Sequence, residues 1–220
     1  MISQKCADII IQHLKEFINN KGNVVLAVCG GRSVAPIFEI LAKSSSIDWG
    51  KVHIFMVDER LVKIDSSDSN FKIFKENFLD NRTSVKPKPV LHPFLYYPEV
   101  KDKGTEEYER EIAALGGNYD IALFSSGEDG HVGALYPNHH SIHDDSEYYI
   151  LMDDSPKPPS KRMSSSKKLL ARTKVAILLV LGEAKRGVLE KITDKALSVT
   201  QCPAKLVMDL PTSYLLTDLK

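Results

Sequence analysis

The chain has 220 residues, 43% of them hydrophobic and 26% charged, which is enough to bury a sizeable core within one compact unit or two closely packed lobes. Its 29 basic residues balance 29 acidic residues, which excludes a global field that would attract nucleic acid or an anionic membrane surface. An anionic ligand must therefore be bound by local groups. We expect a single domain over residues 1–220, as a monomer or weak homodimer.

Three cysteines, Cys6, Cys29 and Cys202, are widely spaced and form no C-x-x-C pair. This spacing argues against a disulfide framework and against a zinc ribbon, and it fits a reducing cytosol. The N-terminus lacks a cationic region followed by an apolar block, and no apolar stretch approaches the ~18 residues of a membrane span. The sequence therefore predicts a soluble, unprocessed cytoplasmic protein with no membrane partner.

Short apolar runs alternate with segments of helical periodicity along the chain. Apolar residues from Ile2 to Ile18 recur at helical spacing, and Lys21-Gly22-Asn23 ends that pattern. Buried strands are predicted at 24–28, 52–57, 121–124 and 175–180, and further helices near 37–41, 69–78, 105–115 and 183–192. Alternating strands and helices indicate an α/β fold, a three-layer sandwich with a mainly parallel sheet flanked by helices.

Two segments interrupt this alternation. Residues 86–89, Lys-Pro-Lys-Pro, are interpreted as a surface connection, with 90–97 as a mixed segment. Residues 155–174 contain seven Lys or Arg and no acid. That segment is basic enough to meet a phosphate, and a solvated, mobile loop is the alternative.

A polar loop follows the strand predicted at 121–124 and presents Glu128, Asp129 and His131 between glycines at 127 and 130. Glycines permit a tight turn after a buried strand. Imidazole takes up and returns protons near neutral pH, so His131 is a candidate general base whose tautomer a neighbouring carboxylate can fix. A structural loop with a surface histidine is the alternative.

Three other strand ends carry polar groups, and such ends are where ligands collect in parallel sheets. Gly30-Gly31-Arg32-Ser33 offers backbone N–H groups and a positive charge to a phosphate, although Ser33 could simply cap the next helix. Asp58-Glu59-Arg60 is expected as a charged loop at a cleft edge, or as a salt-bridged strand end. Lys185 lies in a first helical turn, where a cation calls for an anion unless it is solvated.

Weaker patterns receive structural interpretations. His139-His140-x-x-His143 has a spacing that a metal could use, yet no Cys or Glu completes it, so an exposed loop and no metal are expected. Ser125-Ser126-Gly127 lacks the G-x-S-x-G turn of serine hydrolases. Ser69 and Asn70 are interpreted as helix caps.

These pieces together resemble the 6-phosphogluconolactonase family. The resemblance is carried by GGRS, VDERLV with DSN, GEDGH before ALYP, SPKPPSKR and LGEAKRGVL, in that order from residue 24 onward. It implies hydrolysis of 6-phospho-D-glucono-1,5-lactone to 6-phosphogluconate in the pentose phosphate pathway, without an organic cofactor. It assigns the base to His131, with Asp58 and Arg60 lining the cleft.

The same resemblance assigns substrate and phosphate binding to further residues. They are Gly30, Gly31, Arg32, Ser33, Arg162 and Lys185. Glu128, Asp129 and Gly130 are expected to shape the loop or orient His131. Val132, where the family commonly has Thr, and Met163-Ser164 depart from the family pattern and put secondary hydrogen bonds in doubt.

Two alternatives remain open within the wider superfamily. A glucosamine-6-phosphate deaminase would resemble sequences with Asp-Glu-Tyr where this chain has Asp58-Glu59-Arg60. A non-catalytic sugar-phosphate sensor would be expected to carry a DNA-binding helix-turn-helix, and the N-terminus shows no extension to hold one.

Overall fold

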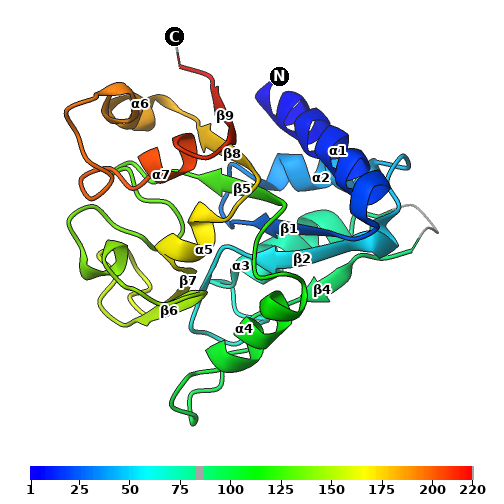
Figure 1. Ribbon diagram of the computed structural model, residues 1–220, viewed down its shortest axis with the longest axis horizontal. Helices are drawn as coiled ribbons and strands as arrows, with labels where there is room; N and C mark the ends of the chain where they lie inside the picture. Colours follow the sequence, from blue (N-terminus) through cyan, green and yellow to red (C-terminus); the bar gives the residue numbers. More distant parts are fainter. Residues whose placement is uncertain (83–86, 220) are drawn as a thin grey trace.

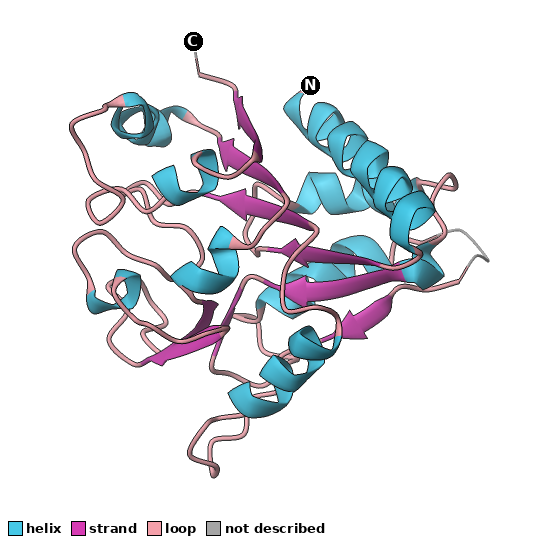
Figure 2. Ribbon diagram, viewed as in Figure 1, coloured by secondary structure: helices cyan, strands magenta, loops and turns pink. Residues whose placement is uncertain are grey.

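A six-stranded parallel sheet forms the centre of the computed structural model, which describes residues 1–82 and 87–219 (Figures 1 and 2). Its strand order is β4-β2-β1-β5-β8-β9, and every neighbouring pair is parallel. The strands are β1 (Val24–Val28), β2 (Val52–Met56), β4 (Val90–His92), β5 (Ile121–Ser125), β8 (Val175–Val180) and β9 (Thr212–Thr217).

Helices flank this sheet, with α1 and α2 on one side and α4 on the other (Figure 1). The α-helices are α1 (Ile2–Lys21), α2 (Ala35–Lys43), α3 (Asn70–Phe74), α4 (Thr105–Ala114), α5 (Lys167–Ala171), α6 (Arg186–Thr193) and α7 (Lys205–Met208). Shorter helical turns are η1 (Trp49–Lys51), η2 (Lys75–Leu79), η3 (His140–Ile142) and η4 (Glu183–Lys185). The predicted α/β fold class is confirmed.

A second, antiparallel sheet of three short strands lies beyond the carboxyl ends of the main strands (Figure 2). It contains β3 (Asp58–Arg60), β7 (Arg162–Ser165) and β6 (Tyr149–Met152), in the order β3-β7-β6. The interpretation of Asp58-Glu59-Arg60 as a loop was therefore wrong, because these residues pair with 162–164. Likewise, residues 155–174 do not form one mobile loop, since they contain β7 and α5.

The central strands are buried along their whole length, as the continuous apolar runs predicted. All five residues of β1 and all six of β8 are buried, because helices cover both faces. A chain of hydroxyl groups joins the two sheets: the Tyr119 hydroxyl lies 2.9 Å from those of Tyr149 and Ser165, and the latter donates to the Val57 carbonyl. The small sheet is thus fixed to the main one by buried hydrogen bonds.

Outside the main elements, the predicted surface connection at 86–89 lies partly beyond the described residues; Pro87 and Lys88 are exposed, whereas Pro89 is buried. Among the described helices, none has the length and apolar character needed to cross a membrane.

Strand order determines where a ligand can bind. From β1 the chain proceeds to β2 on one side of the sheet, whereas β5 is followed by β8 on the other side. The connections after β1 and β5 therefore diverge and leave a crevice at the carboxyl ends of these neighbouring strands.

Candidate active site

A pocket of about 260 Å³ occupies this crevice. Its volume is near the lower end of the ~300 to 1,000 Å³ that small-molecule sites span. The lining residues come from the end of β1, from β3, from the start of α3, from the end of β5 and the loop after it, and from the segment that leads into β7. They are Cys29, Gly30, Asp58, Arg60, Asn70, Ser125, His131, Gly133, Lys157, Pro158 and Arg162.

His131 enters the pocket in a fixed orientation. Its Nδ1 lies 2.6 Å from Asp129 Oδ1, and the same oxygen accepts the His131 backbone N–H at 3.2 Å. Burial by itself would raise the pKa of Asp129, but hydrogen bonds and charge from His131 outweigh it and lower the pKa to about 2. An ionised Asp129 holds the proton on Nδ1, which leaves the Nε2 lone pair available.

Two glycines make room for this arrangement. A Cβ on Gly127 would lie 2.0 Å from His131 Cε1, so the imidazole occupies the space that a side chain would need. Gly130 has φ +99°, a conformation that side-chain-bearing residues rarely adopt. The glycines therefore set the imidazole position, in addition to permitting a turn.

Arg162 is buried and holds the segment next to the pocket. Its Nε and Nη2 donate to the carbonyls of Pro159, Pro158 and Lys157, and Nη1 lies 3.6 Å from Asp58 Oδ2. These contacts occupy most of its donors, so Arg162 organises the 157–159 turn. These contacts give no support to the prediction that Arg162 binds phosphate directly, which stays a prediction.

Two side chains at the pocket carry polar atoms without partners among the described residues. They are Arg60 Nε, a donor, and Asn70 Oδ1, an acceptor. The rest of each side chain is held, because Arg60 Nη1 donates to the Asp68 carbonyl and Asn70 Nδ2 to the Asp58 carbonyl. Buried polar atoms are normally paired, so an orphan donor and acceptor in one pocket favour a polar ligand.

A chain of polar groups extends from the pocket along Ser125. The Ser125 Oγ lies 3.0 Å from Ser33 Oγ and accepts from Lys185 Nζ at 3.1 Å. Burial lowers the pKa of Lys185, so this lysine is not merely solvated. Nor does Ser33 cap α2, whose N-cap is Val34 and has no side-chain capping bond.

The glycine loop after β1 offers unused backbone donors. The N–H groups of residues 30–33, all within the described part of the chain, make no intramolecular hydrogen bond. Gly30 also approaches Asn70 so closely that a Cβ there would lie 1.9 Å from Asn70 Oδ1. A run of free N–H groups beside Lys185 is a suitable environment for an anion.

Seven of the twelve predicted site residues do not line the pocket: Gly31, Arg32, Ser33, Glu128, Asp129, Gly130 and Lys185. Arg32 and Glu128 are exposed, and no hydrogen bond or ion pair joins Glu128 to His131. Asp129 is therefore the carboxylate of this loop that orients His131.

Sequence reasoning missed several groups at the pocket, chiefly Asn70, Ser125 and Lys157. Ser69 is the helix cap as predicted, since its Oγ accepts the Lys72 N–H, whereas Asn70 turns into the pocket. The Nζ of Lys157 lies 4.0 Å from Asp129 Oδ2, and this lysine belongs to the SPKPPSKR motif. The position of this lysine between two prolines of that motif was the sequence feature that could have indicated a place at the pocket.

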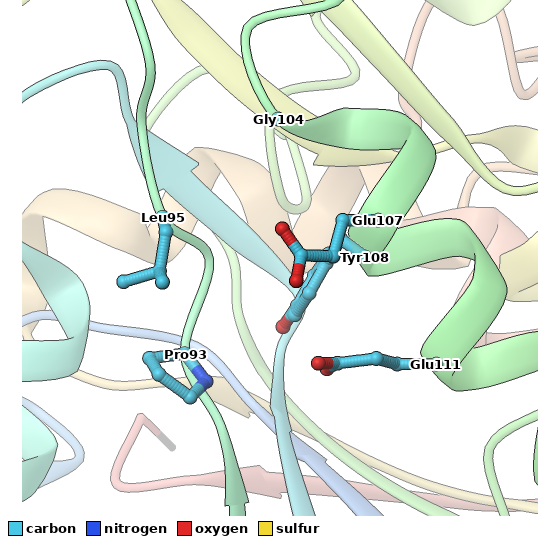
Figure 3. Close-up of a pocket in the computed structure, with 6 residues that line it drawn as sticks. All are labelled: Pro93, Leu95, Gly104, Glu107, Tyr108 and Glu111. Atoms are coloured by element: carbon cyan, nitrogen blue, oxygen red, sulfur yellow. The ribbon is translucent and has the colours of Figure 1, made fainter.

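A different hollow, of about 60 Å³, lies between α4 and the segment after β4 (Figure 3). The side chains of Glu107 and Glu111 extend from α4 toward Pro93 and Leu95. This hollow is well below the ~300 Å³ at which small-molecule sites begin, and its two carboxylates would repel an anionic ligand.

The pocket at the crevice thus combines a free imidazole nitrogen, two arginines and a lysine, and it adjoins a loop with unused backbone N–H groups. Such a set can activate water next to an electrophilic carbon while holding an anionic substrate.

Comparison with known proteins places this geometry in a family. A family model described as glucosamine-6-phosphate isomerases/6-phosphogluconolactonase matches residues 1–215. A 6-phosphogluconolactonase of Borreliella burgdorferi is 30% identical over 197 residues, covering 89% of this chain and 83% of that protein. A probable 6-phosphogluconolactonase of Dictyostelium discoideum is 25% identical over 207 residues, covering 93% and 88%.

Solved structures share the fold. The 6-phosphogluconolactonase of Thermotoga maritima aligns with a TM-score of 0.83 and 24% identity, over 98% of this chain and 94% of that one. A Shewanella baltica 6-phosphogluconolactonase aligns with a TM-score of 0.86 and 22% identity, over 98% and 91%. The chain belongs to the glucosamine-6-phosphate isomerase/6-phosphogluconolactonase family.

Proposed function

We propose that this chain is a 6-phosphogluconolactonase, which hydrolyses 6-phospho-D-glucono-1,5-lactone to 6-phosphogluconate in the pentose phosphate pathway. The observation that carries the proposal is His131, held by Asp129 with its Nε2 free in a pocket lined by Arg60 and Lys157. The names of the relatives agree with this reaction. Cytoplasmic location and a monomeric or weakly dimeric state stay predictions.

His131 acts as the base in the proposed mechanism. Its Nε2 takes a proton from water while the water oxygen bonds to the lactone carbonyl carbon, and the carbonyl electrons move to oxygen. The cationic side chains of Arg60 and Lys157 stabilise that oxyanion. When the carbonyl re-forms, the bond to the ring oxygen breaks, and the ring oxygen receives the proton from the His131 imidazolium.

The phosphate of the substrate is assigned to the other end of the site. The free N–H groups of residues 30–33, with Ser125 and Lys185, provide donors for its oxygens. Burial lowers the pKa of Lys185, and a phosphate dianion beside it would favour the charged form and so oppose that shift. Asn70 Oδ1 remains to accept a substrate hydroxyl.

The test is an assay of freshly prepared 6-phosphogluconolactone, in which acid release is measured against spontaneous hydrolysis. Glucosamine 6-phosphate is the competing substrate, because the same family model covers its isomerases. We expect acid release from the lactone and no ammonia from the amino sugar. The reverse result would assign the chain to the isomerase branch.

A second test of the proposed function replaces the proposed base, His131. His131→Ala is expected to lower kcat by at least ~100-fold with little change in KM, from the usual contribution of a positioned base. His143→Ala is the matched control, since that exposed histidine lies outside the pocket. Near-wild-type turnover by His131→Ala would refute the mechanism.

A further inference from the structure

A group of three metal-ligating side chains lies outside the pocket. His140 begins the helical turn η3 and His139 precedes it, and Asp154 follows β6, fourteen residues after His140. One ligand atom from each of the three lies within 4.8 Å of the other two. The sequence pattern suggested His143 as the third histidine, but the fold replaces it with a carboxylate.

The separations suit one metal ion. A tetrahedral ion with bonds of about 2.0 to 2.2 Å to nitrogen and oxygen holds its ligand atoms roughly 3.3 Å apart. Here Asp154 Oδ1 lies 3.0 Å from His140 Nε2 and 3.5 Å from His139 Nε2. These two separations fit a tetrahedral ion, and the third, between the two histidines, is below 4.8 Å.

The side chain of His139 is also oriented in a way that suits metal binding. Its side chain is only 17% exposed, and its Nε2 is buried without a hydrogen-bond partner among the described residues. Its Nδ1 lies 3.0 Å from Ser141 Oγ, which can accept the Nδ1 proton and leave Nε2 as a lone pair. Metal-bound histidines commonly have their second nitrogen fixed in this way.

A competing arrangement needs no metal. If Nδ1 instead accepts the Ser141 backbone N–H at 3.3 Å, the Nε2 proton points toward Asp154, and the group is an ordinary histidine–aspartate cluster. The 3.5 Å separation is too long for a good hydrogen bond, which leaves that arrangement poorly satisfied.

We propose that His139, His140 and Asp154 bind one divalent transition-metal ion of the Zn²⁺ type. Two imidazoles and one carboxylate match the ligands that Zn²⁺ prefers, and solvent supplies the fourth position. Water has access, because the side chains of His140 and Asp154 are 58% and 55% exposed.

The proposed ion would join two segments next to the pocket. Tyr136 packs its ring between His131 and His139, at centroid distances of 4.7 and 5.8 Å, and its hydroxyl accepts a hydrogen bond from Ser155. The ion would cross-link the same two segments through Asp154 and His139. Its expected effect is to stabilise them, while His131 performs the reaction without the metal.

The experiment titrates Zn²⁺ into tag-free, metal-stripped full-length protein by calorimetry, and repeats the titration with Co²⁺ to record its visible absorption. We expect one equivalent of each ion to bind, an intense tetrahedral cobalt spectrum, and a melting temperature that rises with Zn²⁺ concentration. Failure of either ion to bind, or a cobalt spectrum of the weak octahedral type, would overturn the proposal.

Variants locate the ion. His140→Ala and Asp154→Asn are each expected to weaken Zn²⁺ binding by at least ~10-fold, since each removes one of three protein ligands. His143→Ala and Asp153→Asn, which change neighbouring residues of the same type, should bind as the wild type does. If His131→Ala abolishes binding while His140→Ala does not, the ion sits at the active site and the proposal fails.

Discussion

At the scale of single residues, the position and tautomer of one imidazole depend on two neighbours. Asp129 fixes the Nδ1 proton of His131 at 2.6 Å, and the missing side chain of Gly127 leaves space for the ring. Neither neighbour needs to touch the substrate. Substitutions of Asp129 or Gly127 should therefore lower the rate because they shift the His131 ring or change its tautomer, and not because they remove a contact to the lactone.

Asp129→Asn is expected to lower kcat by about 10²- to 10⁴-fold, because an amide neither stabilises the imidazolium nor enforces the tautomer. Lactone hydrolysis measures this loss. Glu128→Gln removes the same charge from the adjacent exposed residue and should retain activity. Equal losses in both variants would show that loop charge, and not the hydrogen bond to His131, is responsible.

Asp129 also links stability to pH. Its folded-state pKa, about 2, lies below its ordinary value of 3.8, so its ionised form stabilises the fold above about pH 4. This contribution is lost as the pH falls through 2. The difference in unfolding free energy between wild type and Asp129→Asn, measured in urea, should narrow as the pH falls from about 4 through 2. A difference that widened between pH 4 and pH 2 would contradict the role assigned to the ionised Asp129.

Gly127→Ala tests the space next to the ring. The backbone of Gly127 is not in the left-handed region, so the methyl group is accommodated only if the His131 ring moves. We expect kcat to fall by at least ~10-fold with the fold retained, as judged by circular dichroism, since small displacements of catalytic groups are costly. Gly187→Ala, where a Cβ meets open space, is the control. An active Gly127→Ala variant would show that the ring has freedom to shift.

At the scale of elements, one buried carboxylate connects β3 to the start of α3. Glu59 accepts the backbone N–H groups of Arg60, Asn70 and Phe71 and the hydroxyl of Ser69. Burial raises the pKa of Glu59, although these N–H groups partly offset it. The carboxylate thereby fixes where the helix begins and so where Asn70 enters the pocket.

Glu59→Gln places an amide NH₂ among four donors. We expect it to destabilise the fold by about 1 to 3 kcal/mol and to raise KM through displacement of Asn70. Urea unfolding and steady-state kinetics measure the two effects. Glu76→Gln, at an exposed position on the following helical turn, should change neither. An unchanged KM in a destabilised Glu59→Gln variant would separate Asn70 from substrate binding.

The main elements of the fold could be predicted from the sequence, whereas the small sheet could not. The long, uniformly apolar strands and amphipathic helices were predicted, because their periodicity is local. The small sheet was not: β3 and β7 are three or four residues long, largely polar, and pair across about 100 positions of sequence. Their pairing is a tertiary effect, which local patterns do not encode. Asn70 was missed for a similar reason, since its role depends on Gly30 approaching it.

At the scale of the whole molecule, the two ends of the sheet differ in role. The connections that follow β1 and β5 diverge at their carboxyl ends and leave the pocket between them, whereas Asp120 joins the amino ends of the two strands by a hydrogen bond. This carboxylate is fully buried, accepts the Val25 N–H at 2.8 Å, and pairs with Lys21 at 2.6 Å and Lys174 at 3.0 Å. It joins the α1–β1 connection to β5 and to the residue before β8.

Asp120→Ala is therefore expected to destabilise the protein without altering its chemistry. The substitution leaves the buried Val25 N–H without an acceptor, whereas the partly exposed ammonium groups of Lys21 and Lys174 can be hydrated, for a cost of about 1 to 3 kcal/mol in the free energy of unfolding. Lys174→Met, which removes one half-exposed partner, should cost less than ~1 kcal/mol. Because Asp120 lies at the end of the strands opposite His131, kcat and KM of the folded fraction should match the wild type. A kinetic defect in fully folded Asp120→Ala protein would mean that the amino end of the sheet also controls the geometry of the pocket.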